Sequence, residues 1–252
     1  MIKLYHEMDL SCPHLDDAAY SCGGRIWEQT RKGDIVEVWT LFAGDPPEGP
    51  LPPFAEIMHM IWETGRDAFS IRRAEDETAC RILGAIPVHF PFADCIYRRN
   101  SASGEPLVQF KEDLSAPYTP AEVPLLQGII ATLQSRLPPD VLLACPLALG
   151  SHRDHQLTRA AAEALHRPLR YYADYPYSEE TDDLPQWIQP GWEAEPIPLS
   201  DAGIRAWQAA IAAHSSQLSS FWISREEMET AIAAHAHTVA GNTLWASMPS
   251  SE

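Results

Sequence analysis

Residues 8–43 read MDLSCPHLDDAAYSCGGRIWEQTRKGDIVEVWTLFA, and this stretch decides the fold class. A short strand is expected near residues 8–12, followed by a helix from Asp17 to Lys32. A glycine turn then leads into the apolar run at residues 35–43, which is typical of a strand buried on both faces. A strand, a helix and a second strand in this order predict a parallel βαβ unit.

The remainder of the chain continues the alternation. Further helices are expected at residues 63–84, 120–136 and 152–166, and further strands at 86–92, 140–145 and 169–173. Residues 174–199 read as a long loop, and two helices, 200–218 and 224–237, are expected to close the chain. We therefore predict an α/β fold, a Rossmann-like and mostly parallel sheet with helices on both faces, in a single domain over residues 1–252. Ligands of such folds bind at the carboxyl ends of the strands.

Composition limits the function. The 252 residues include 18 Lys and Arg against 35 Asp and Glu, a formal net charge of −17. This charge repels phosphate backbones and anionic headgroups, so we expect no nucleic-acid partner and no membrane docking. Glu7 and Asp9 interrupt the apolar stretch that a secretory signal needs, and the five cysteines form no CxxC pair. A cytoplasmic protein with reduced cysteines is expected.

The first segment of chemical interest is SCPHLDD at residues 11–17, between the first strand and the first helix. Helix capping explains one aspartate, because a carboxylate accepts hydrogen bonds from the first-turn N–H groups. Capping does not explain His14, and it leaves Asp16 and Asp17 repelling one another. A chemical role therefore competes with capping at this turn.

The second segment is LGSHRDH at residues 149–155, which follows the strand expected at 140–145. On a helix His152 and His155 share a face, as two ligands or a ligand and a catalytic group would. The alternative is a capping box in which Ser151 begins the helix and Asp154 replaces the usual Glu or Gln.

Together the two segments supply the open ligand set of catalytic zinc. Two imidazoles and one carboxylate would bind the metal and leave a position for water: His14, His155 and Asp17. Asp16 remains as a general base, and Asp154 would orient His152 and favour its charged form.

These motifs resemble those of the LmbE-like (PIG-L type) N-acetylglucosamine deacetylase superfamily, whose members carry a PHPDDE-like and an HxDH motif. Here they read PHLDDA at residues 13–18 and HRDH at 152–155. Weaker similarities are the glycine pair at 23–24, the segment 71–84 and Ser216-Gln217. The resemblance covers most of the chain. It implies a hydrolase that uses Zn²⁺, with Fe²⁺ as the other metal that fits, to remove the acyl group from an N-acyl amino sugar or glycoside conjugate.

The resemblance also implies a mechanism. Zinc on its three ligands lowers the pKa of bound water to about 7. Asp16 removes a proton as this water attacks the amide carbonyl, and protonated His152, held by Asp154, stabilises the oxyanion together with the metal. These three residues are the expected catalytic groups. The expected partner is a small N-acylated sugar or conjugate, and a homo-oligomer remains open.

Two departures from the family pattern leave alternatives open. Leu15 replaces the family proline, and Ala18 replaces a glutamate that would lie near the metal ligands. A catalytically degenerate member that binds sugar or metal without turnover is one alternative. An Fe(II) oxygenase is another, since its facial triad is also two histidines and a carboxylate, although such enzymes are typically all-β barrels.

Other residues have two interpretations each. Arg72 is a candidate for substrate binding through a sugar hydroxyl or phosphate, but an ion pair with Glu75 on the same helix face is the alternative. Several aromatic residues either wall a carbohydrate pocket or pack the long loop onto the body: Tyr171, Tyr172, Tyr175, Tyr177, Trp187 and Trp192. No Gly-rich phosphate-binding motif indicates a nucleotide cofactor.

Overall fold

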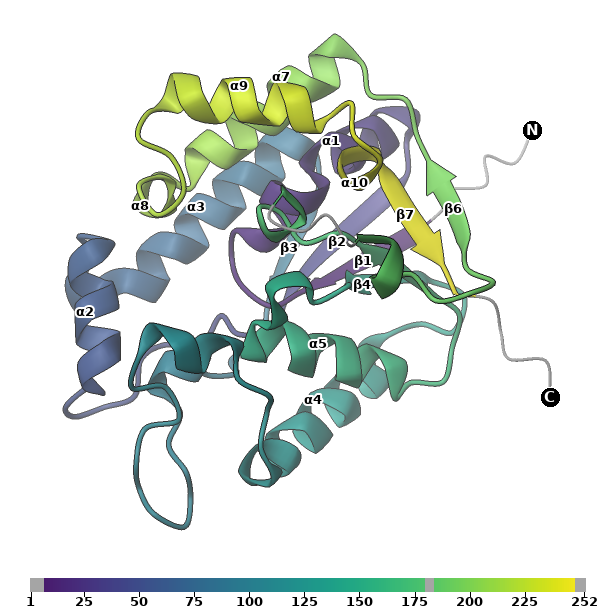
Figure 1. Cartoon of the computed structure of the whole chain (residues 1–252). Coiled ribbons are helices and arrows are strands. Elements are labelled where there is room, and N and C mark those ends of the chain that lie inside the picture. The colour runs from purple at the N-terminus through teal and green to yellow at the C-terminus, as the bar shows by residue number, and fades with distance from the viewer. Residues whose placement is uncertain (1–6, 180–183, 248–252) are drawn as a thin grey trace.

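A seven-stranded sheet forms the centre of the computed structural model, which describes residues 7–179 and 184–247 (Figure 1). Its strands are β1 (Glu7–Cys12), β2 (Ile35–Thr40), β3 (Ile86–His89), β4 (Leu142–Pro146), β5 (Leu169–Tyr172), β6 (Glu193–Pro196) and β7 (Thr243–Ala246). The spatial order is β3-β2-β1-β4-β5-β7-β6. The first five strands in that order are parallel to one another, whereas β7 is antiparallel to both β5 and β6. The predicted α/β class and mostly parallel sheet are confirmed.

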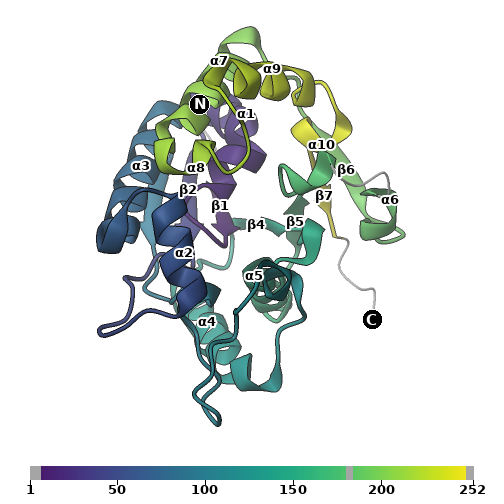
Figure 2. The same cartoon turned by 60° about the vertical axis from the view of Figure 1, so that its left-hand side comes forward.

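Helices cover both faces of the sheet. The α-helices are α1 (Asp17–Lys32), α2 (Pro53–Ile61), α3 (Ala68–Leu83), α4 (Val123–Arg136), α5 (Arg153–Glu163), α6 (Leu184–Trp187), α7 (Asp201–Ala213), α8 (Ser215–Leu218), α9 (Arg225–His235) and α10 (Val239–Asn242). Helices α1, α3, α7 and α9 lie on one side, and α4 and α5 on the other (Figures 1 and 2). No helix in the described part of the chain is both long and apolar enough to cross a membrane.

The structure corrects two expectations about local structure. Residues 174–199 are not simply a loop, since their described part contains α6 and β6, and the described part of the chain ends with β7 rather than with a helix. Both strands have only four residues. β6 lies at the sheet edge with mostly exposed side chains, and the buried apolar run of β7 is too short to distinguish a strand from a helix. Helix α2 begins on a proline, which a first turn tolerates, and left-handed Glu63 (φ 55°) separates it from α3.

Helix α1 is fixed against α7 by close backbone packing. A Cβ atom on Gly23 would lie 2.4 Å from Cδ1 of Trp207, so only glycine lets the indole approach this closely. The Trp207 indole N–H donates to the Ala19 carbonyl at 2.7 Å. This contact holds helix α1 in place, with Asp17 as its first residue and Asp16 directly before it.

Strand order brings the two motifs together. β1 and β4 are hydrogen-bonded parallel neighbours, with Met8 opposite Leu142 and Leu10 opposite Ala144. Their carboxyl ends therefore meet at the same edge of the sheet, as ligand sites in open parallel sheets require.

Candidate active site

The turn after β1 directs His14 and Asp17 toward each other. The backbone N–H of His14 donates to Asp17 Oδ2 at 2.7 Å, and its Nδ1 lies 3.3 Å from the same oxygen. Asp16 occupies the position before α1, yet its side chain makes no capping hydrogen bond. Capping therefore accounts for neither aspartate.

The turn after β4 aims the second motif. His152 precedes α5, and its Nδ1 accepts the backbone N–H of Asp154 at 3.3 Å. The helix is thus capped by His152 itself, and the alternative of a Ser151–Asp154 capping box is wrong. Ala148 and Ser151 adopt left-handed conformations with φ of 62° and 56°, which L-residues rarely adopt.

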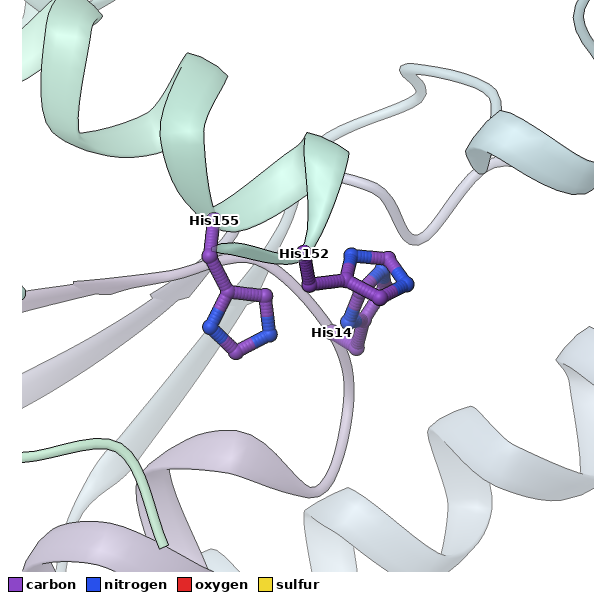
Figure 3. A group of neighbouring side chains, drawn as sticks. All are labelled: His14, His152 and His155. Atoms are coloured by element: carbon purple, nitrogen blue, oxygen red, sulfur yellow. The ribbon is translucent and has the colours of Figure 1, made fainter. Parts of the chain in front are cut away.

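Three imidazoles converge where these turns meet. Figure 3 shows His152 and His155 extending from the start of α5 toward His14 on the loop after β1. The ring centroids lie 4.9 Å apart for His14 and His152, 5.5 Å for His14 and His155, and 5.2 Å for His152 and His155. One ring nitrogen of each lies within 4.8 Å of the others, so the group could hold a metal ion.

Asp17 lies between two of these rings. Its Oδ2 is 3.3 Å from His14 Nδ1, and its Oδ1 is 3.5 Å from His155 Nε2. The structure therefore brings together the three residues expected as metal ligands. Two further groups of possible ligands share the same neighbourhood: Cys95, His152 and Asp154, and His14, Asp94 and Asp154.

His14 and His155 each contact a second buried carboxylate through the ring nitrogen that does not face Asp17. His155 Nδ1 lies 2.5 Å from Asp174 Oδ1, and His14 Nε2 lies 3.2 Å from Asp154 Oδ2. Such carboxylates fix the tautomer and orientation of metal-binding histidines. Sequence reasoning missed Asp174 and also Asp94, 3.6 Å from His14 Nε2. Asp174 follows the carboxyl end of β5 closely, which is the signal that could have found it.

The electrostatics of the cluster favour positive charge on His14 and His155. Burial alone lowers both pKa values, but hydrogen bonds from His14 to Asp154 and Asp17 hold its pKa well above the usual value. The charge of Asp17 and the bond to Asp174 likewise raise the pKa of His155. Burial opposes ionisation of Asp17 too, but the charge of His155 and the hydrogen bond to His14 keep its pKa low.

His152 differs from the expectation of a charged imidazole. Its burial, followed by the charges of His14 and His155, holds the pKa of His152 well below the usual value. Asp154 orients the ring through its backbone N–H, while its fully buried carboxylate bonds to His14 and to the Cys95 backbone N–H at 3.0 Å. Because Nδ1 of His152 accepts a hydrogen bond, the neutral ring carries its proton on Nε2.

An alternating chain of buried charges anchors Asp154. Arg98 Nη2 lies 2.6 Å from Asp154 Oδ1 and donates to Glu122 Oε1 at 2.9 Å. Glu122 Oε2 in turn accepts from Arg153 Nη1 at 2.6 Å. All four side chains are at most 9% exposed, and their charges balance. Arg153, the variable residue of the second motif, is thus part of the support of the site.

Asp16 and Arg72 form the opposite part of the site. Arg72 is buried, its Nη2 donates to Asp16 Oδ1 at 2.9 Å, and its guanidinium lies 4.8 Å from the centre of the Trp62 ring. The alternative of an Arg72–Glu75 pair is wrong, because Glu75 instead accepts three hydrogen bonds from Ser215 and Ser216. Among the described residues, Asp16 Oδ2 has no hydrogen-bond partner.

A pocket opens over these groups. Its polar lining includes His14, Asp16, Asp17, Tyr20, Arg72, Asp94, His152, His155, Gln217 and Ser220. Its apolar and aromatic lining consists of Phe54, Met58, Trp62, Ile96, Leu114, Tyr175, Pro176, Tyr177 and Phe221. Tyr175 and Tyr177 therefore line the pocket, whereas Tyr171 stacks on Trp192 at 4.1 Å, as the packing interpretation expects.

Comparison with known proteins places the chain in a family. The family model described as PIG-L, GlcNAc-PI de-N-acetylase, matches residues 10–166. A search of curated proteins finds no match.

Solved structures with similar folds include several deacetylases. Teicoplanin deacetylase Orf2, in its zinc-inhibited form, is 26% identical, with a TM-score of 0.80 over 98% of this chain and 99% of that chain. The A40926 pseudoaglycone deacetylase Dbv21 is 28% identical, with a TM-score of 0.71 over 98% and 99%. N,N'-diacetylchitobiose deacetylase from Pyrococcus horikoshii, 20% identical with a TM-score of 0.56 over 98% and 85%, shares the fold.

These similarities agree with the sequence motifs and with the parallel sheet whose carboxyl edge carries them. The family match covers more than half of the chain and includes both motifs. The chain belongs to the PIG-L (GlcNAc-PI de-N-acetylase) family and is a hydrolytic enzyme of the deacetylase type.

Proposed function

We propose that this enzyme is zinc-dependent and removes the acyl group, an acetyl group in the simplest case, from an N-acylated amino sugar in a small glycoside conjugate. One observation carries the proposal. Asp17 lies between His14 Nδ1 and His155 Nε2, at 3.3 and 3.5 Å, with the carboxylate of Asp16 on the wall of the same pocket.

The residues fit a catalytic zinc ion. His14, Asp17 and His155 would hold it, a set of two imidazoles and one carboxylate that leaves room for water. The carboxylates that raise the pKa values of the two imidazoles create a region that favours a cation. Fe²⁺ suits the same donor set, so metal content must be measured.

When bound, zinc supplies Lewis-acid chemistry, which lowers the pKa of a coordinated water to about 7 and polarises the amide carbonyl. Asp16 has its Oδ1 held by Arg72 and its Oδ2 free of described partners, so Oδ2 is placed to take the proton of the attacking water. Neutral His152 offers its Nε2–H to the developing oxyanion. Asp154 positions both histidines: its carboxylate bonds to His14, and its backbone N–H donates to His152.

The pocket supports an amphiphilic substrate. The pocket is lined by apolar side chains from α2 and from residues 96–114 and by aromatic rings at 175, 177 and 221, in addition to its acidic groups. Such walls suit the apolar part of a conjugate, and the carboxylates disfavour a polyanion. Orf2 is described as a teicoplanin deacetylase, and a deacetylase of the teicoplanin pathway has been crystallised with teicoplanin, which supports an N-acylated sugar on a larger small-molecule scaffold.

The test compares wild type with Asp16→Asn, both loaded with zinc. Activity is measured as free amine released from a panel of N-acetylglucosamine glycosides. We expect Asp16→Asn to lower kcat by a factor of about 10²–10⁴ and to keep the wild-type zinc content, as measured by mass spectrometry. Asp45→Asn, at an aspartate with 72% of its side chain exposed, is the matched control and is expected to leave both unchanged.

Each other outcome rejects a specific part. Loss of zinc together with activity would reject Asp16 as the base and make it a metal ligand. Stoichiometric zinc without amine release from any member of the panel would favour the degenerate, binding-only alternative. Oxygen consumption coupled to 2-oxoglutarate would favour the oxygenase.

A further inference from the structure

The wall of the pocket formed by α1 and α3 carries buried polar atoms without partners. Tyr20 is 2% exposed and Arg72 is 4% exposed, and both line the pocket. Among the described residues, the Tyr20 hydroxyl and Arg72 Nε have no hydrogen-bond partner. Native proteins satisfy most buried polar groups, because an unpaired group loses its hydration without compensation. Two such atoms on residues that line the same side of the pocket leave hydrogen-bonding capacity there.

The place of Tyr20 connects this wall to the reacting centre. Tyr20 lies four residues after Asp16, so the two side chains share a face of the helix start, and the Tyr20 backbone N–H donates to the Asp16 carbonyl at 2.9 Å. The charge of Asp16 adds to burial in raising the pKa of the phenol, so the hydroxyl stays protonated. A protonated phenol can donate one hydrogen bond and can also accept hydrogen bonds through its oxygen.

The ring of Tyr20 is held by packing rather than by its hydroxyl. Ring centroids lie 6.0 Å from His214, 5.6 Å from Phe221 and 5.5 Å from Trp222. These contacts fix the direction of the phenol, whose buried oxygen has no hydrogen-bond partner among the described residues. A rigid aromatic ring with a free polar end is well suited to specific recognition.

We propose that the Tyr20 hydroxyl contacts a hydroxyl group of the substrate sugar, beside the acyl amide, and that Tyr20 determines specificity for that sugar. This inference rests on the proposed deacylation. A neutral hydroxyl fits better than an anion, because Asp16, Asp17 and Asp94 line the same pocket. Arg72 Nε offers a second donor at the same wall.

The experiment uses Tyr20→Phe, which removes only the oxygen. The matched control is Tyr171→Phe, since Tyr171 is 3% exposed, does not line the pocket and donates its hydroxyl to Glu163 at 3.2 Å. Tyr20→Phe is expected to raise KM for N-acetylglucosamine glycosides about tenfold, with kcat within about threefold of wild type. Without substrate, its melting temperature is expected to equal or exceed that of wild type, whereas Tyr171→Phe lowers the melting temperature and leaves KM unchanged.

A deoxy-sugar panel identifies the contact. Wild type is expected to discriminate about tenfold or more against one N-acetylglucosamine derivative lacking a single hydroxyl, and Tyr20→Phe to treat that derivative and its parent alike. Unchanged KM in Tyr20→Phe, or equal discrimination by both proteins, overturns the proposal. A lowered melting temperature of Tyr20→Phe with unchanged kinetics would show that the hydroxyl serves the fold.

A binding measurement separates this inference from the proposed function. Zinc-loaded Asp16→Asn and the double variant Asp16→Asn/Tyr20→Phe are titrated with intact N-acetylglucosamine by calorimetry. Binding about tenfold weaker in the double variant supports the contact even if wild type cleaves nothing. Equal binding, or no binding by either protein, overturns the contact.

Discussion

Two groups of buried polar side chains around the site differ in how completely their ends are paired. The charged wall lies next to the histidines and does not itself line the pocket: its charges alternate from Arg153 through Glu122 and Arg98 to Asp154 with contacts of 2.6–2.9 Å. Only Nε of Arg98 and Nε of Arg153 among its guanidinium nitrogens are buried without a hydrogen-bond partner in the described residues. On the wall formed by α1 and α3, the hydroxyl of Tyr20 and Nε of Arg72 have no described partner. The first wall is organised to hold its side chains in one geometry. The second leaves hydrogen-bonding capacity for a ligand.

The largest effect is expected where the charged wall is broken. Arg98→Met leaves the carboxylates of Asp154 and Glu122 buried without their shared cation, and removing one partner of a buried ion pair costs about 3 kcal/mol or more. Urea unfolding measures the loss. Arg225→Met, which removes an exposed pair with Glu229, is the control and is expected to change stability by less than about 0.5 kcal/mol. Similar losses in both variants would mean that the charged wall is no more organised than the surface.

A smaller effect is expected from a carboxylate that supports an imidazole. Asp174→Asn keeps the shape of the side chain that faces His155 Nδ1 but removes its charge. Zinc affinity, measured by competition with a chromophoric chelator, is expected to fall about 10- to 100-fold. The surface variant Glu195→Gln, which removes a pair with Arg170, should bind zinc like wild type. Unchanged affinity in Asp174→Asn would place the metal away from His155.

The smallest effect is expected on the pH dependence of stability, through His214, whose ring packs against that of Tyr20. It is fully buried, and neither ring nitrogen has a partner among the described residues. Burial lowers its pKa, despite the opposing charges of Asp76, Asp16 and Glu75, with Arg72 acting in the same direction as burial. The unfolded chain therefore binds the proton more readily, and the stability contributed by neutral His214 is lost as the pH falls below about 6.5.

The measurement compares wild type with His214→Leu from pH 8 to pH 5. We expect the two to differ by less than about 1 kcal/mol at pH 8, because no hydrogen bond of His214 is removed. Wild type is expected to lose stability more steeply toward pH 5. Parallel pH profiles would show that His214 does not titrate on unfolding, and a large loss at pH 8 would reveal a partner on this wall.

The sequence allowed the fold class and the pairing of the motifs to be predicted, but not the support around them. The apolar run at residues 35–43 and the helical pattern at 17–32 are strong local signals, and α1 has the predicted bounds. His14, Asp17 and His155 could be grouped because strand order places their turns at one sheet edge. The chain Arg98–Glu122–Arg153 could not be predicted, since its members meet only through tertiary packing. The neutral state of His152 likewise depends on its burial and on two neighbouring rings.

The backbone before α5 bears on any effort to engineer this enzyme. Ala148 and Ser151 keep left-handed conformations that glycine would adopt without strain, and Gly150 leaves room for Tyr177, whose Cδ1 would lie 2.3 Å from an added Cβ. Glycine at 148 or 151 would relieve this strain in the folded chain and would also add conformational freedom to the unfolded chain. The same changes would loosen the turn that aims His152 and His155. At residues 148–151, changes that relieve backbone strain therefore conflict with the alignment of the histidines that turnover requires.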